Sequence, residues 1–229
     1  MNPKIEKLIK MFAKLPRVGG RAAGRIVLAL LQDKTGRAAA LGAALLDAAE
    51  TIRPCTNCGC LTDNGACVYC RDASRGNGQI CVVRDLGDVW TIEKAGVFGG
   101  RYHILGGLIS GCMGTTPDDL NITSLTARIE PEEIREIIFV LPNTVEGKTT
   151  QHYVMSMIQS SKFRVQSSDN KDKNINNKTV ANGDASSEIC TLNSALSFTE
   201  LASGVPLGGD LDYIDDGTLS LAFGRREKI

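Results

Sequence analysis

The sequence lacks the features that would place the chain in a membrane, in a secretory pathway or among strongly charged proteins. No apolar run approaches the ~20 residues that are needed to cross a bilayer. Residues 1–16 are charged throughout and contain no apolar signal-peptide core. Lysine plus arginine number 26, as do aspartate plus glutamate, so the formal net charge is zero. We therefore expect a soluble, cytoplasmic protein with no membrane partner.

The zero net charge hides an uneven distribution along the chain. Residues 1–40 contain nine basic and two acidic residues, a balance of +7, so the remainder carries −7. A basic arm on an acidic body favours a polyanionic partner. With 42% hydrophobic residues in a chain of 229, there is enough apolar material for one large or two small domains.

Eight cysteines are present, and five of them fall in the run CTNCGCLTDNGACVYC. Cys55 and Cys58 form one C-x2-C pair, and Cys67 and Cys70 form a second pair eight residues later. Two such turns supply the four thiolates of a tetrahedral zinc site. The alternatives are disulfides, which the expected compartment disfavours, and reduced core thiols. We predict one structural Zn²⁺ per chain, with Cys60 outside the ligand set.

Apolar spacing predicts helices in the first part of the chain, followed by alternating strands and helices. The alternation is typical of βαβ units with a mostly parallel sheet, so the fold class is α/β. The predicted helices are 3–14, 21–32, 37–52, 86–96, 132–136, 147–160 and 215–223. The predicted strands are 80–83, 102–105, 137–141 and 163–165. Residues 166–197 are polar and aperiodic, which predicts a disordered surface insertion.

The segment LPRVGGRAAGRIVLALL resembles a helix-hairpin-helix. Its glycines allow a sharp turn and leave room for a phosphate, and the second helix begins with free N–H groups. Arg21 and Arg25 are four residues apart and share one helix face, with Arg17 and Lys14 beside them. These residues predict sequence-independent, salt-sensitive binding to the DNA backbone. The alternative is a helical hairpin with a solvated basic face.

Together, the hairpin, the four cysteines and the following α/β region resemble the RecR family of bacterial recombination mediators. Four further segments carry the resemblance: ICVVRDLGDVWTIE, GRYHILGGLIS, NTVEGKTT and LASGVPLGGDLDY. The resemblance implies a Toprim domain, binding to double-stranded, single-stranded or junction DNA, and a dimeric or tetrameric homo-oligomeric ring. It also implies action with RecO and RecF to load RecA at single-strand gaps. The family's basic residues fall on Arg21 and Arg25, and its zinc ligands on the four paired cysteines.

Catalytic Toprim domains hold Mg²⁺ with carboxylates on the first strand and after a later strand. Here Arg84 takes the first-strand position, Asn143 stands at the later acidic position, and Lys148 replaces a second glutamate. Glu146 is the one clear acidic match. We therefore predict a binding platform with no catalytic residues, and Glu146 and Asp88 as candidate partner-binding residues. The alternative function is a Toprim-type metal-dependent nuclease or primase-like enzyme.

Three weaker signals receive structural interpretations. Residues 147–149 read Gly-Lys-Thr, but Pro142 stands where a phosphate-binding loop needs its first glycine. His103 and His152 have no serine or cysteine nucleophile paired with them in the sequence, which favours packing or surface roles over catalysis. Trp90 and Tyr102 are predicted to lie in the core.

The predicted organisation has four parts. Residues 1–52 form the helix-hairpin-helix region, 53–72 the zinc finger, 78–200 the Toprim-like domain with the insertion, and 201–229 a C-terminal tail involved in assembly. A third candidate function is a zinc-ribbon interaction module without a DNA role. Charge reversal at Arg21 and Arg25 is the experiment that distinguishes it from the DNA-binding function.

Overall fold

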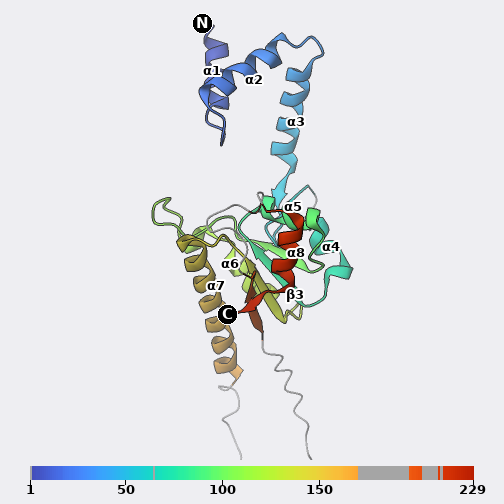
Figure 1. Ribbon diagram of the computed structural model, residues 1–229, viewed down its shortest axis with the longest axis vertical. Coiled ribbons are helices and arrows are strands. Elements are labelled where there is room, and N and C mark those ends of the chain that lie inside the picture. Colours follow the sequence, from blue (N-terminus) through green and yellow to red (C-terminus); the bar gives the residue numbers. More distant parts are fainter. Residues whose placement is uncertain (1, 64, 170–195, 203–210, 212–213) are drawn as a thin grey trace, which may run out of the picture. The chain divides into compact units, whose positions relative to one another are not determined.

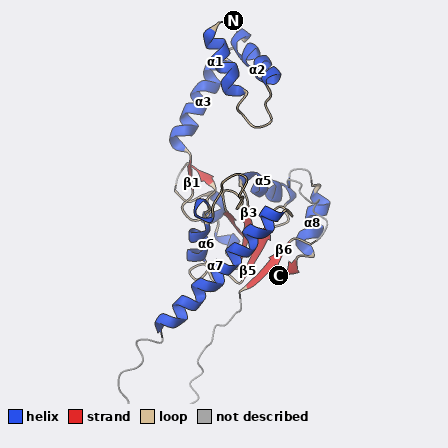
Figure 2. Cartoon of the chain, turned by 90° about the vertical axis from the view of Figure 1, so that its left-hand side faces the viewer, coloured by secondary structure: helices blue, strands red, loops and turns tan. Residues whose placement is uncertain are grey.

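The chain is described here from a computed structural model, which covers residues 2–63, 65–169, 196–202, 211 and 214–229 (Figure 1). It divides into two compact units, residues 1–52 and residues 53–229. The first is all-helical and the second contains the sheet (Figure 2). Each unit is described by itself below.

The first unit consists of three helices, in agreement with the three predicted there. Their bounds are α1 (Pro3–Phe12), α2 (Gly20–Gln32) and α3 (Arg37–Thr51). Asn2 caps α1 by accepting a hydrogen bond from the Lys4 backbone N–H at 2.9 Å. Asp33 follows α2 and accepts from the backbone N–H groups of Thr35 and Arg37, which shapes the turn into α3.

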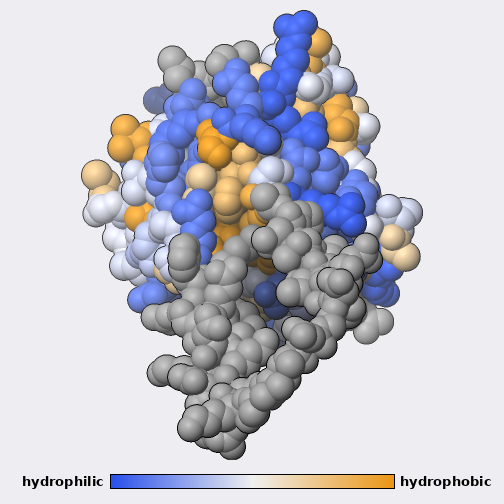
Figure 3. Space-filling view, turned by 90° about the horizontal axis from the view of Figure 1, so that it is seen from below, coloured by the Kyte–Doolittle hydropathy of each residue, from blue (hydrophilic) through white to orange (hydrophobic). Residues whose placement is uncertain are grey.

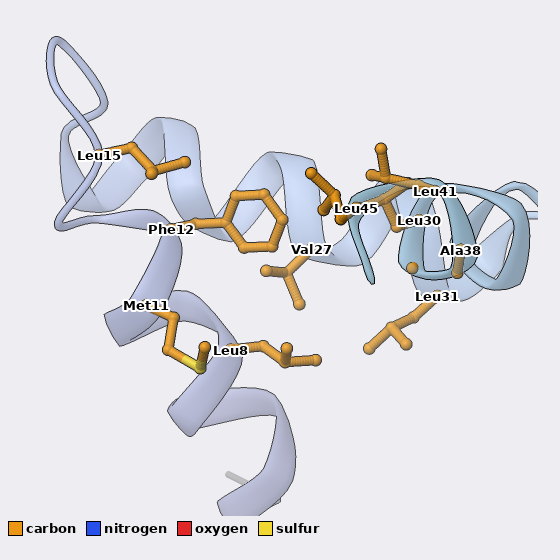
Figure 4. A pocket seen from close by; sticks show the side chains of 11 residues that line it. Leu8, Met11, Phe12, Leu15, Val27, Leu30, Leu31, Ala38, Leu41 and Leu45 are labelled. Atoms are coloured by element: carbon orange, nitrogen blue, oxygen red, sulfur yellow. The ribbon is translucent and has the colours of Figure 1, made fainter. Parts of the chain in front are cut away.

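The core of the first unit is small. Among its described residues, only Ala23 and Val27 are buried. The apolar faces of the three helices instead border an open groove of about 390 Å³, into which Phe12 and Leu45 point (Figure 4). Leu45 is 60% exposed, so a large apolar side chain on α3 remains uncovered within this unit.

The second unit opens with the cysteine segment and continues as an α/β sheet. The cysteine segment contains β1 (Arg53–Pro54), β2 (Leu61–Thr62), α4 (Val68–Arg71) and the 3-10 turn Ala73–Arg75. The sheet has the order β4-β3-β5-β6-β7. Its strands are β3 (Gln79–Val83), β4 (Arg101–Ile104), β5 (Glu136–Val140), β6 (Ser197–Glu200) and β7 (Glu227–Lys228). The first four are parallel, and β7 pairs antiparallel with β6.

Helices cover both faces of this sheet (Figures 1 and 2). Alternation along β3 sends Cys81 and Val83 to one face, with α5 (Leu86–Ala95) and α8 (Asp216–Gly224). Ile80 and Val82 face the other side, with α6 (Ile122–Arg128) and α7 (Val145–Asp169). The predicted α/β class with a mostly parallel sheet is confirmed. The sequence could predict it because strands that are buried on both faces are continuous apolar runs.

Two secondary-structure predictions are wrong. The predicted helix 132–136 is a turn that enters β5, because Glu133 has a positive φ of 50° and the Arg135 backbone N–H donates to Gly78 O. The helix of this region is α6, which the sequence ITSLTAR hides behind residues of low helix propensity. The predicted strand 163–165 is part of α7.

The predicted insertion overlaps the end of α7 at 166–169, and its residues 170–195 lie outside the described part of the chain. The prediction of core packing for Trp90 is also wrong, because its side chain is 62% exposed. Val89 and Ile92 define the buried face of α5, and the helical period turns Trp90 away from both. Tyr102 is buried as predicted, and His103, for which the sequence leaves both packing and surface roles open, is buried as well.

No helix among the described residues is long and apolar enough to span a membrane. Seen from below, the described surface is mainly hydrophilic, with hydrophobic residues gathered near its centre (Figure 3). The buried apolar residues of the second unit instead form the two clusters that lie on either side of the sheet.

Candidate nucleic-acid interface and metal centre

The hairpin between α1 and α2 presents an uncapped helix N-terminus. Gly19 is the N-cap of α2 and has no side chain to bond the first turn, although its carbonyl accepts from the Ala23 N–H at 2.9 Å. The first N–H groups of α2 therefore point outward at the positive end of the helix dipole, a ready site for an anion. Arg21 and Arg25 are both exposed on the first two turns of this helix.

The glycines of this turn are not required by contacts within the chain. A Cβ built on Gly19 or Gly20 would meet no heavy atom within 4 Å, and neither residue has a positive φ. The space that each leaves open therefore faces outward and is available to an external group. Glycine at the first helical position lowers helix stability, so the open space comes at a conformational cost.

Arg17 adopts a backbone conformation that arginine rarely takes. Its φ is 62°, in the left-handed region, and its side chain is exposed in the turn. Glycine adopts this conformation without strain, so Arg17 carries a conformational cost that glycine would not. Lys14 is exposed between α1 and Arg17, so the four predicted DNA-binding side chains all lie on the surface of the first unit.

The second site is a cluster of cysteines. The Sγ atoms of Cys55, Cys58, Cys67 and Cys70 all lie within 4.8 Å of one another, and those of Cys58 and Cys67 are 3.3 Å apart. A tetrahedral Zn²⁺ with bonds of about 2.3 Å has sulfur atoms about 3.8 Å apart. The four thiols thus fit a single metal ion, whereas Cys60 is buried outside the set.

Local hydrogen bonds shape the two cysteine turns. The Gly59 N–H donates to Cys55 O at 2.9 Å, and the Cys70 N–H donates to Cys67 O at 3.1 Å. Gly59 has a φ of 78°, and a Cβ there would lie 2.9 Å from the Ile104 carbonyl oxygen. Glycine is therefore needed at this position both for the turn and for close contact with β4.

The environment affects the thiols differently. Burial opposes ionisation of Cys55, but backbone hydrogen bonds from Cys67, Cys58 and Asn57 lower the pKa of its thiol to about 7. The pKa of Cys58 is raised by its hydrogen bond with Cys60, and that of Cys70 by its hydrogen bond with Cys58. Four thiolates this close would repel one another, and a bound cation would offset that repulsion.

The cysteine module is attached to the edge of the sheet by contacts that the sequence did not predict. The Ile104 N–H of β4 donates to Cys58 O at 2.7 Å. The ring of Tyr69 makes an edge contact with that of Tyr102 at 5.3 Å, and the Arg75 guanidinium lies over both rings. Arg75 also pairs with Glu93 at 2.7 Å. No short-range pattern indicates these partners, because they are far apart in the sequence.

The first Toprim-type position lies at the end of β3. The Arg84 guanidinium contacts Asp85 at 2.9 Å and Asp88 at 3.5 Å. Asp85 and Asp88 form the capping box of α5, and Asp88 is only 3% exposed. Burial raises the pKa of Asp88 to about 6. The carboxylate of Asp88 is therefore held inside the fold, away from a docking protein.

The later positions lie after β5, at the start of α7. Asn143 and Glu146 are exposed, whereas the Lys148 ammonium pairs with Glu200 of β6 at 2.6 Å. A Cβ on Gly147 would lie 1.9 Å from the Pro142 carbonyl oxygen, so this glycine is required by the close packing of the turn. The structure thus explains the Gly-Lys-Thr run without a phosphate-binding loop.

An exposed basic hairpin, a four-cysteine module and a Toprim-like α/β domain define the class of helix-hairpin-helix and Toprim proteins that bind DNA. Residues 5–49 match the RecR helix-hairpin-helix family, 78–167 the Toprim domain family and 204–226 the RecR C-terminal family. The chain belongs to the RecR family of recombination proteins.

Similar proteins match over nearly their whole length. A recombination protein RecR from Maricaulis maris (strain MCS10) is 40% identical over 228 residues, which is 100% of this chain and 97% of the relative. RecR from Cereibacter sphaeroides (strain ATCC 17025 / ATH 2.4.3) is 38% identical over 98% of this chain and 96% of its own length. RecR from Ruegeria sp. (strain TM1040) is 38% identical over 100% of this chain and 98% of its own length.

Proposed function

We propose that this protein is a non-enzymatic mediator of recombinational DNA repair that binds DNA phosphates through its N-terminal hairpin. The observation that carries the proposal is the uncapped start of α2, with Arg21 and Arg25 beside it and open space at Gly19 and Gly20. Arg17 and Lys14 extend the same basic surface. The contacts are sequence-independent, so duplex, single-stranded and junction DNA all qualify as ligands.

The second element of the proposal is one structural Zn²⁺ per chain. Cys55, Cys58, Cys67 and Cys70 would fill its coordination shell and leave no open position for water, so the ion would stabilise structure and take no part in catalysis. Because Cys58 also bonds β4 through its carbonyl, the ion would fix the cysteine module on the sheet edge.

The third element is self-assembly. Only two described side chains of the first unit are buried, and its groove is lined almost entirely by apolar side chains. A second copy of the chain is the occupant that we propose, because exposed leucines such as Leu41 and Leu45 match the core of an obligate interface. Assembly into a dimer or a tetrameric ring would place several basic hairpins around one DNA. The C-terminal tail, 201–229, is proposed to contribute to assembly.

The fourth element is a partner surface on the Toprim domain. RecO and RecF are the proposed partners, and RecA loading at single-strand gaps is the proposed outcome. Of the two acidic candidates, Glu146 is exposed at the start of α7, whereas Asp88 is buried in the α5 capping box. We therefore propose Glu146 as the contact residue and assign Asp88 to helix capping.

The Toprim domain is proposed to be a platform for binding. Arg84 is paired with the carboxylates beside it, and Lys148 neutralises Glu200, so the carboxylates around these positions are largely engaged by cations of the chain. A divalent cation would have to displace these pairs. We propose that residues 1–52 bind DNA and that residues 53–72 bind zinc. Residues 78–200 would form the binding platform, and residues 201–229 would contribute to assembly.

The test is DNA binding by fluorescence anisotropy over a salt series, with Arg21→Glu/Arg25→Glu compared with the wild type. Loss of binding, with zinc content and oligomer size retained, supports the proposal. The control Lys94→Glu/Arg135→Glu makes the same change of charge at exposed sites on the second unit, outside the assembly tail, and should bind like the wild type. Equal binding by the hairpin variant and the wild type would refute the proposal.

The enzymatic alternative is tested on the same samples. Incubation of labelled DNA or of nucleotides with Mg²⁺ should yield no cleaved or extended product. Turnover that depends on Mg²⁺ and is lost in a Glu146→Gln variant would instead establish a Toprim-type enzyme.

A further inference from the structure

A network of one buried and two partly buried charged residues joins α6 to β4, the strand that contacts the cysteine module. Arg128 is only 5% exposed, and its Nε and Nη2 atoms donate to the two carboxylate oxygens of Glu132 at 2.8 and 3.1 Å. The same carboxylate pairs with Arg101 Nη1 at 2.8 Å. Two guanidinium groups and one carboxylate leave this network with a net charge of +1.

The network is anchored to three consecutive residues of β4. Arg128 Nη1 donates to the Tyr102 carbonyl oxygen at 2.8 Å and lies 3.3 Å from His103 Nδ1. The next residue, Ile104, donates its N–H to the carbonyl oxygen of Cys58. The Arg128 guanidinium and a cysteine of the cluster are thus held by the same short stretch of strand.

His103 does not add to the positive charge. Its Nε2 lies 2.6 Å from the Asn121 carbonyl oxygen, which can only accept, so Nε2 carries the proton. Its Nδ1 is then the acceptor for Arg128. Burial lowers the pKa of His103 to about 4, so the imidazole is neutral at physiological pH and the network retains its charge of +1.

The cysteine cluster provides the opposite charge. Four thiolates around one Zn²⁺ carry a net charge of −2, which is costly to bury unless a cation lies near. The Tyr102 carbonyl, which accepts from Arg128, and the Ile104 N–H, which donates to the Cys58 carbonyl, point to the same edge of β4. The Arg128 guanidinium therefore lies beside the backbone of a cluster cysteine. The two buried charges therefore compensate each other across the boundary between the cysteine module and the sheet.

We infer that Arg128 is a positioning residue for the metal centre, which balances the charge of the thiolate cluster and couples metal binding to the structure of β4 and α6. The inference rests on the proposed zinc site. With metal bound, the cluster is negative and the network is positive, so the two attract each other. Removal of the metal takes away the negatively charged metal–thiolate centre beside Arg128, so β4 and α6 should loosen along with the cysteine turns.

The first test measures zinc affinity of the full-length protein by competition with a chromophoric chelator. Arg128→Met should weaken binding about 10–100-fold, the range typical of groups that support metal ligands. Arg128→Lys, which keeps the charge, should recover most of that loss. The matched control is Arg226→Met, which breaks the Arg226 pair with Glu136 at 2.6 Å elsewhere on the sheet and should leave zinc affinity unchanged.

Unchanged zinc affinity in Arg128→Met would overturn the inference, as would an equal loss in Arg226→Met. Failure of the wild type to bind zinc would refute the proposed zinc site itself, a distinct outcome.

The second test needs no variant and covers the case in which Arg128→Met does not fold. Hydrogen exchange of the wild-type protein is measured before and after zinc removal by a chelator. Exchange should increase in residues 101–104 and 122–128 as well as in 53–72, while 145–160 of α7 stays protected. An increase confined to 53–72 would overturn the coupling.

Discussion

Replacement of Arg17 by glycine should make the protein more stable and its DNA binding weaker. Arg17 has a φ of 62°, where the Cβ of any residue but glycine crowds the backbone. Arg17 is exposed beside the start of α2, so we expect its charge to contribute to the proposed DNA surface. Arg17→Gly separates the two contributions, because it relieves the strain and removes the charge.

The magnitude follows from two opposing terms. The left-handed conformation costs about 1–2 kcal/mol in a residue with a side chain. Glycine also lowers stability by about 0.5–1 kcal/mol, because a glycine residue has more conformational freedom in the unfolded state. This cost offsets part of the gain from the relieved strain. The expected net gain in unfolding free energy is about 0.5–1 kcal/mol. With an m-value of roughly 2 kcal/mol/M, the urea midpoint should rise by roughly 0.3–0.5 M.

The assay combines urea denaturation, at a fixed protein concentration, with a salt series of DNA binding. Loss of one phosphate contact should reduce the slope of log affinity against log salt by about 0.9 for duplex DNA. Glu133→Gly is the matched control, because Glu133 also has a positive φ, of 50°, but lies in the turn before β5. It should gain stability and bind DNA like the wild type.

Arg17→Lys keeps the charge and the strain, so both readouts should stay near those of the wild type. The reasoning is refuted if Arg17→Gly is no more stable than the wild type while Glu133→Gly is. It is refuted equally if the salt slopes of Arg17→Gly and the wild type are the same.

Three further predictions concern the groove, the capping carboxylate and the hairpin glycines. Gly20→Ala should raise stability by about 0.5 kcal/mol through helix propensity. It should also weaken DNA binding several-fold, because the added methyl group fills the open space proposed for a DNA phosphate. Unchanged binding in the anisotropy assay would contradict this. Asp88→Asn should match the wild type in stability near pH 3 and exceed it by up to about 3 kcal/mol above pH 6. The reason is that the folded pKa is about 6 against 3.8 unfolded, so wild-type stability falls as pH rises through this window. Denaturation of both proteins from about pH 3 to 7.5 checks it. Leu45→Glu should shift the oligomer toward monomer in light scattering, whereas Met113→Glu, at an 82% exposed site of the second unit, should not.

The sequence predicted the features that depend on local spacing. The two C-x2-C pairs require only tight turns, and the four cysteines do come together. The strand Ile137–Leu141 is a run of apolar residues long enough to be buried on both faces, and β5 lies there with a shift of one residue. Arg21 and Arg25 were placed on one exposed face because the helical period fixes their separation.

Features that depend on tertiary packing were missed. Helix α6 contains Ile122 and two threonines, which have low helix propensity, and it forms because Ile122 and Leu125 are buried against the sheet. Trp90 was assigned to the core by its apolarity, although the opposite face of α5 carries the packing. The contacts of Arg128 and Glu132 with β4 join segments that no short pattern relates.

The small core of the first unit has a consequence for how the protein responds to its own abundance. Ala23 and Val27 are the buried residues among those described in the three-helix unit, so the unit gains little stability from its own packing. If a second copy completes that core, the folded hairpin and the assembled protein form in a single equilibrium. DNA affinity would then rise steeply with protein concentration, so that synthesis of the protein would itself act as the switch for DNA binding.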